Sequence, residues 1–299
     1  MLMAEQSAKT DLGRLCPDPF LIVDEDTGEK YYGGSQSWFG RNSMTFAGCG
    51  IIAAANTVRA LLCRYPGAYR EARGNLKTLG NVILTKAEYI KVIESMYRRM
   101  FVAELPLLNL IYDKGNYKYG SRLLGCVPPS LGMNSESLVR GLLRYAENRG
   151  VLLHDVYLSA AYVEYRKGLE FIREGLDKNG ALILLTSFNR HPVTLYRGNA
   201  WDISGGGYES EIKTHFSTIT DIIEENGEPL IKLSTWGRAA TVPYRVLHAA
   251  WQKRLAYVSA LIYFVPKRSR ALYRADMRKT ALFTPISTLQ SVLGRRFRS

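Results

Sequence analysis

The architecture of this chain of 299 residues follows from one segment, Gly48-Cys49-Gly50-Ile51-Ile52-Ala53-Ala54-Ala55-Asn56-Thr57. A cysteine between two glycines opens a run of small and apolar residues, which predicts a helix from Cys49 to about Arg64, ended by Pro66 and Gly67. Apolar residues cover most of the surface of this helix, so we expect it to lie buried at the centre of the fold.

Helices are expected in the first half of the chain and strands in the second. Besides the central helix, apolar periodicity predicts helices at 85–103, 135–148 and 162–177, the first of which starts with a capping box of Thr85 and Glu88. After Gly180 the pattern becomes that of strands, at 181–187, 213–223, 230–236 and 256–265, with a short helix at 244–254. This segregation predicts an α+β fold, in which a helical N-terminal lobe packs on an antiparallel β-sheet lobe, with one cleft between them.

Composition and charge divide the chain into three regions. We expect a loosely ordered lead-in at 1–30, one domain at 31–265 and a basic tail at 266–299. From residue 265 onward there are nine basic residues and one acid, an excess of +8 that would attract a polyanion or an acidic protein. No apolar run reaches 18 residues, and the first 15 residues lack the apolar core of a secretory signal, so we expect no transmembrane segment and a cytoplasmic location.

The four cysteines, at positions 16, 49, 63 and 126, lie far apart. None forms a CxxC pair and no histidine lies at metal-ligand spacing from a cysteine, so no metal or other cofactor is expected. Nothing in the spacing calls for disulfides, and reduced cysteines are the simpler expectation. Cys49 differs from the others because the positive end of a helix dipole and free N–H groups favour its thiolate.

His215 is the candidate base for Cys49, and it lies on the strand predicted at 213–223. Strand alternation puts His215 and Asp221 on one face. If Asn226-Gly227 makes a symmetric two-residue turn, Ser234 and Trp236 share that face, but Ser234 then lies two pairs away from the histidine. A bulge or a longer loop would close this gap, and a one-residue bulge would move Ser234 to the other face.

Three short motifs together resemble the papain-like cysteine peptidase superfamily. They are Gly48-Cys49-Gly50 at a helix start, His215-Phe216-Ser217-Thr218-Ile219 on a strand, and Ser234-Thr235-Trp236-Gly237 on the returning strand. The likeness covers about residues 30–265 and is closest to the bacterial branches related to bacteriocin-processing peptidases. It implies a papain-like fold with Cys49 as nucleophile, His215 as base and Trp236 as a shield for the residue that orients the histidine.

The chain departs from the pattern of that superfamily at two positions. Ser234 stands where the family has the Asn or Asp that orients the histidine, and Asp221 is an alternative source of a carboxylate. Ser43 stands where the family has a Gln that binds the oxyanion, which leaves Gln36 and Asn42 as candidate donors.

The resemblance implies a thiol hydrolase or peptidase that cleaves a peptide or amide bond. The alternative is a non-catalytic binding module on the same fold, which would dock an anionic partner through the basic tail.

Overall fold

The computed structural model describes residues 18–100, 103–104, 130–186, 193–197, 208–212, 214–252 and 259–267. The helical elements are η1 (Gln36–Trp38), α2 (Asn42–Ala47), α3 (Cys49–Arg64), α4 (Pro66–Glu71), α5 (Gly74–Thr78), α6 (Lys86–Arg99), α8 (Ser135–Glu147), α9 (Tyr165–Asn179) and α10 (Tyr244–Trp251). The strands are β1 (Leu21–Val23), β2 (Lys30–Tyr32), β3 (Ala103–Glu104), β4 (Ser130–Gly132), β5 (Leu153–Ser159), β6 (Leu182–Thr186), β7 (Val193–Arg197), β8 (Tyr208–Ile212), β9 (His215–Glu225), β10 (Glu228–Thr235), β11 (Arg238–Pro243) and β12 (Ala260–Pro266).

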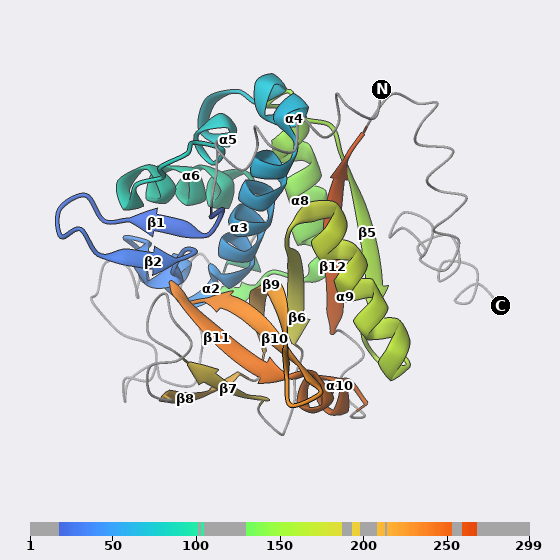
Figure 1. Cartoon of the computed structure of the whole chain (residues 1–299). Coiled ribbons are helices and arrows are strands. Elements are labelled where there is room, and N and C mark those ends of the chain that lie inside the picture. The colour runs from blue at the N-terminus through green and yellow to red at the C-terminus, as the bar shows by residue number, and fades with distance from the viewer. Residues whose placement is uncertain are drawn as a thin grey trace.

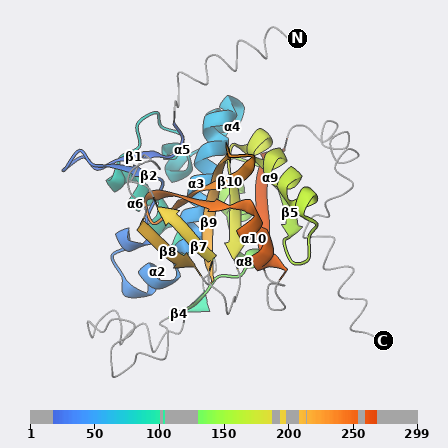
Figure 2. The same ribbon diagram turned by 60° about the horizontal axis from the view of Figure 1, so that its bottom comes forward.

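One antiparallel sheet forms the middle of the molecule. Its strands follow the order β5-β12-β6-β9-β10-β11-β7-β8, in which the first six make the main part and β7 and β8 extend it beyond β11. Two further pairs, β1 with β2 and β3 with β4, form small separate sheets. Figure 2 shows β9 and β10 in the middle of the view, with α9 and α10 to the right and α2 and α6 to the left.

Helices cover both faces of this sheet. The central helix α3 packs on β9, β6 and β12 and is flanked by α6 and α8, as Figure 1 shows. On β6, Ile183 and Leu185 belong to the core beneath α3, whereas Leu182 and Leu184 belong to the core beneath α9 and α10. Alternating residues of one strand thus fill two cores, as the period of two of a β-strand requires.

The predicted α+β class is confirmed, and most of its helices are confirmed as well. The central helix runs over Cys49–Arg64 with its first three turns buried, and α6 starts at the capping box of Thr85 and Glu88. Gly180 ends α9 in a left-handed conformation with φ +81°. The N-terminal helices pack on the antiparallel sheet as predicted, and α9 and α10 cover the second face of that sheet.

The hairpin of β9 and β10 carries a bulge. Asn226 and Gly227 have φ of +51° and +77°, the positive pair that a type I′ turn needs. From the turn the register runs evenly to the pair Lys232–Asp221, but the next pair is Leu233–Ile219, so Thr220 is an extra residue on β9. Beyond the bulge Ser234 lies opposite Thr218. Ser234 and Thr235 therefore each point to the face of the sheet opposite to the one that an even register predicts.

The folded part begins before residue 31, so the expectation of a loose lead-in over 1–30 is wrong for residues 18–30. Phe20 and Ile22 are buried, and β1 pairs with β2. The buried guanidinium of Arg59, on α3, donates hydrogen bonds to the carbonyls of Pro19 and Leu21 and so fastens this segment to the central helix. Of the expected basic tail, only Pro266 and Lys267 lie within the described residues.

The state of the cysteines also differs from expectation. Cys63, on α3, is disulfide-bonded, and Cys49 is a free thiol. Cys16 and Cys126 lie outside the described residues. The expectation of reduced cysteines is therefore wrong for Cys63, and disulfides are rare in the cytosol. None of the helices in the described ranges is both long and apolar enough to cross a membrane.

Candidate functional site

Cys49 stands at a sharp bend between two helices. Gly48 ends α2 and caps α3, so the chain enters the central helix directly from a preceding one. A side chain on Gly48 would come within 2.3 Å of the Phe39 ring and 2.5 Å of the Met44 carbonyl, so only glycine allows this close approach. The bend places Cys49 in the first turn of α3, where backbone N–H groups have no partner within the helix.

The surroundings of the Cys49 sulfur act on its pKa in opposite directions. Burial raises the pKa of the thiol, whereas hydrogen bonds from the backbone N–H groups of Phe216, Gly50 and Cys49 itself lower it. Burial dominates, so the pKa lies above its ordinary value of 9.0. The helix start therefore lowers the pKa of the thiol as expected, but burial raises this pKa by more. The Phe216 N–H also ties the sulfur to β9 at the residue next to His215.

His215 is held by two neighbours from the β10–β11 turn. Its Nε2 lies 2.8 Å from Thr235 Oγ1, and its ring stacks on Trp236 with 4.6 Å between ring centres and 24° between planes. Trp236 therefore packs directly on the imidazole. Trp236 and Gly237 form a tight turn with φ of +52° and +75°. Such a conformation is strained for tryptophan, so the packing against His215 and the turn hold it in place.

Thr235, and not Ser234, is the partner of His215. The bulge at Thr220 turns Ser234 toward α3, where its hydroxyl donates to the Tyr32 carbonyl at 2.8 Å. Asp221 lies six residues from His215 along β9, about 20 Å at the usual rise of a strand, and it is exposed. The structure therefore brings neither Ser234 nor Asp221 to the imidazole. Thr235 belongs to the same Ser-Thr-Trp-Gly motif, but only the bulge reveals its role.

Asn56 joins the parts of the site from inside the protein. It lies seven residues after Cys49 on α3 and is 1% exposed. Its Oδ1 accepts hydrogen bonds from the Gly34 N–H at 3.2 Å and the Tyr89 hydroxyl at 2.7 Å. Its Nδ2 donates to Ser234 at 3.1 Å and Thr218 at 3.4 Å. One amide thus connects the segment before η1 with α6, β9 and β10.

Gln36 reaches the site although it lies thirteen residues before Cys49. Ser35 caps the short helix η1, which carries Gln36 beside the central helix α3, and α2 fills the chain between them. Gln36, Cys49, His215 and Thr235 line one small pocket between α3 and the ends of β9 and β10. Asn42 is the first residue of α2, and its side chain lies outside what the structure describes.

The volume of this pocket is small. Its cavity volume is about 10 Å³, close to the space that one water molecule occupies. The remaining lining residues come from the same three elements and from the Trp236 turn: Ile52, Ala53, Phe216, Ser217, Thr218, Ser234 and Trp236. Cys49, which lines this pocket, is itself partly exposed.

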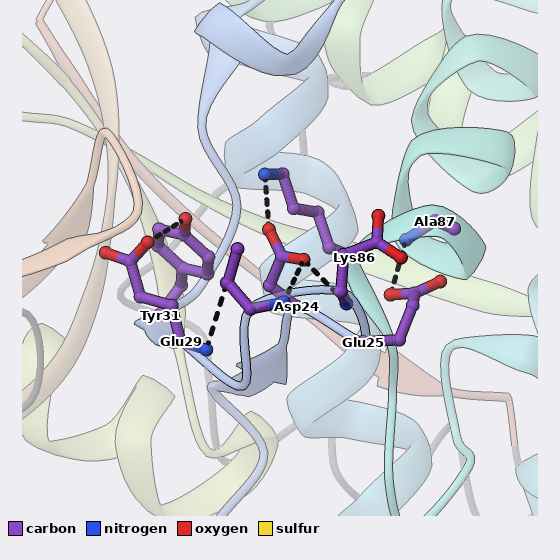
Figure 3. Close-up of polar contacts among 8 residues, drawn as sticks. Asp24, Glu25, Glu29, Tyr31, Lys86 and Ala87 are labelled. Atoms are coloured by element: carbon purple, nitrogen blue, oxygen red, sulfur yellow. Dashed lines mark hydrogen bonds and ion pairs between the residues drawn. The ribbon is translucent and has the colours of Figure 1, made fainter.

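An aromatic and charged cluster supports the Trp236–Gly237 turn from outside. Lys86 forms an ion pair with Asp24 at 2.6 Å and lies over the rings of Tyr31 and Trp38 at 5.4 and 5.6 Å. Figure 3 shows Lys86 reaching Asp24 from the start of α6. The rings of Tyr31 and Trp38 pack edge to face and also border Gly237, so this cluster fixes the position of the turn.

Comparison with known proteins adds no family to this picture: no family model matches the chain, and no curated protein matches it either. Among the described residues there is also no group of three or more His, Cys, Asp or Glu side chains that could hold a metal ion. The feature of the molecule that bears on its function is the pocket that Cys49 and His215 share.

Proposed function

We propose that this protein is a thiol hydrolase or acyl-transfer enzyme that acts on a peptide or amide bond, with Cys49 as nucleophile and His215 as base. The observation that carries the proposal is the single pocket lined by Cys49, His215, Thr235 and Gln36. A nucleophile, a base held by a third group, and an amide donor are the parts that acyl transfer through a thiol requires.

Each group has a separate task in the proposed reaction. The Cys49 sulfur attacks the carbonyl carbon and passes its proton to Nδ1 of His215, since Nε2 is engaged by Thr235. The backbone N–H of Cys49 and the amide of Gln36 stabilise the negative oxygen that forms. The histidine then gives its proton to the leaving amine, and water or a second acceptor releases the acyl group from the sulfur. Trp236 keeps bulk water from the imidazole.

The raised pKa of Cys49 bears on the order of these events. The thiol keeps its proton at neutral pH, so the resting site is a neutral thiol beside the histidine. Attack and proton transfer are therefore coupled, and the base is needed at the moment of reaction.

The proposal is tested with peptides, because a mixed library reveals cleavage whichever peptide sequence the site accepts. The full chain is incubated with such a library, and new termini are detected by mass spectrometry. Cys49→Ala and His215→Gln should each abolish cleavage, and the double variant should be little worse, because the two residues act as one unit. Asp221→Asn, an exposed change on the same strand, serves as the matched control and should cleave normally. Cleavage that survives in Cys49→Ala would rule out the mechanism.

The alternative function is a non-catalytic binding module that docks a polyanion or acidic protein. The small volume of the pocket favours it, because a cavity of about 10 Å³ holds about one water molecule. It predicts no cleavage of any peptide, together with retention on heparin that falls steeply with salt and disappears when the chain is truncated after Lys267.

A further inference from the structure

Ser217 is a buried polar residue of the pocket to which the proposed reaction assigns no role. It lies two residues after His215 on β9, is 2% exposed and lines the same cavity as Cys49. Its Oγ has no hydrogen-bond partner among the groups that the structure describes. Buried hydroxyl groups in proteins nearly always have a partner, either a protein group or an ordered water.

The bulge in the hairpin places Ser217 beside the residue that holds the histidine. Ser234 and Thr218 form the last pair of this ladder, and Thr235 and Ser217 are the next residues along the two strands. Cross-strand neighbours of this kind have their Cβ atoms about 4.5–5.5 Å apart, on the same face. When Nε2–H of His215 donates to Thr235 Oγ1, the Thr235 hydroxyl proton must find an acceptor elsewhere. Ser217 Oγ is on the correct side but does not bond to Thr235 directly.

Gln36 supplies a third polar group that needs a hydrogen-bond partner. Its Oε1 is buried and has no partner among the described residues, and Gln36 lines the same cavity. The cavity volume of about 10 Å³ is close to that needed for one water molecule. A buried water typically makes about three hydrogen bonds, which is the number of polar groups that these three residues offer.

We propose that one ordered water binds between Thr235, Ser217 and Gln36 and that Ser217 is a positioning residue of the site. The water accepts the Thr235 hydroxyl proton and donates to Ser217 Oγ and to Gln36 Oε1. An uncharged chain of His215, Thr235, water and Ser217 then orients the imidazole, which the superfamily achieves with an Asn or Asp. Because the water holds Oε1, the Nε2 end of the Gln36 amide is left to face the substrate. The presence of this water does not depend on catalysis, whereas the positioning role of Ser217 rests on the proposed function.

Two variants of Ser217 separate a positioning role from a merely structural one. Ser217→Ala removes the hydroxyl, and Ser217→Thr keeps it in a residue that suits a strand. We compare the rate at which iodoacetamide alkylates Cys49 between pH 6 and 9, the titration of the His215 ring by NMR, and a high-resolution crystal structure of the full chain. Ser217→Ala should slow alkylation by roughly 3–10-fold, the usual worth of one hydrogen bond, and should move the His215 titration to lower pH. Ser217→Thr should stay within about twofold of the wild type.

The results for the water site can be told apart from a failure of the proposed function, which would appear as an absence of peptide cleavage. A density peak for water within hydrogen-bond distance of Ser217 Oγ and Thr235 Oγ1, lost in Ser217→Ala, supports the water site even if no peptide is cleaved. The proposal is overturned if the crystal structure has no such water, or if Ser217→Ala leaves both the alkylation profile and the His215 titration unchanged. Stability gives an independent check, because removal of a hydroxyl without any partner would be neutral or stabilising, whereas loss of a bound water is destabilising.

Discussion

Replacing Asn56 tests whether a single buried amide connects the parts of the site. In Asn56→Ala, the Gly34 N–H and Thr218 Oγ1 lose the partner that Asn56 provides. The Tyr89 hydroxyl keeps a longer contact with the Ile52 carbonyl at 3.4 Å, and Ser234 keeps its bond to Tyr32. Two newly unpartnered buried groups, at about 1–3 kcal/mol each, predict a loss of about 2–6 kcal/mol in the free energy of unfolding.

Thr57 is the matched control, because it is the next residue of the same helix and is equally buried. Its Oγ1 has no hydrogen-bond partner among the described residues, and Asn179 binds only its backbone carbonyl. Thr57→Val keeps the shape and removes an unpartnered hydroxyl, so its effect should be neutral or stabilising. The two substitutions thus compare neighbouring buried side chains, of which Asn56 has hydrogen-bond partners and the Thr57 hydroxyl has none among the described residues.

Urea unfolding followed by circular dichroism measures both effects. The midpoint of Asn56→Ala should shift to lower urea without a large change in slope, and Thr57→Val should unfold at or above the wild-type midpoint. If Asn56→Ala were within about 0.5 kcal/mol of the wild type, or if Thr57→Val were the more damaging of the two, the argument from hydrogen-bond partners would be refuted.

Two further predictions concern the cysteine and the loop that carries Gln36. Because burial raises the pKa of Cys49, iodoacetamide should alkylate it slowly at pH 6, with a rate still rising at pH 9; a plateau below pH 7 would contradict this. The unfolded chain loses this proton first, so the free energy of unfolding should fall as pH rises past about 9, and this fall should be smaller in Cys49→Ser. Gly33→Ala would place Cβ 2.1 Å from Ser234 Oγ at a backbone φ of +74°, and should cost about 2–5 kcal/mol in urea unfolding. Gly28→Ala, at φ +72° with no atom within 4 Å, should cost only about 1–2 kcal/mol, and equal losses for the two would show that the close contact is unimportant.

Local patterns in the sequence were sufficient to predict the central helix that carries Cys49 and the helix α6 beside it. The bounds of α3 and the capping box of α6 follow from residues within a few positions of each other, because helix caps and propensities are local. The turn at Asn226-Gly227 was predictable for the same reason, since both positions need positive φ. The strand β5 and the small strands β7, β8 and β11 were not predicted, because burial within the sheet depends on neighbours that are distant in sequence.

The sequence by itself determined which chemical groups are available: a cysteine at a helix start, a histidine on a strand, and a Ser-Thr-Trp-Gly turn. Only the tertiary structure decided which of them meet. A single extra residue, Thr220, reverses the faces of β10 and exchanges Ser234 for Thr235 at the histidine, and no turn or spacing in the sequence marks this bulge. Likewise, the bend at Gly48 and the anchoring of the Gly33–Gly34 segment by Asn56 bring Gln36 beside Cys49. The pKa of the thiol was decided by burial in the folded protein, which outweighs the helix-start effect that the sequence predicts.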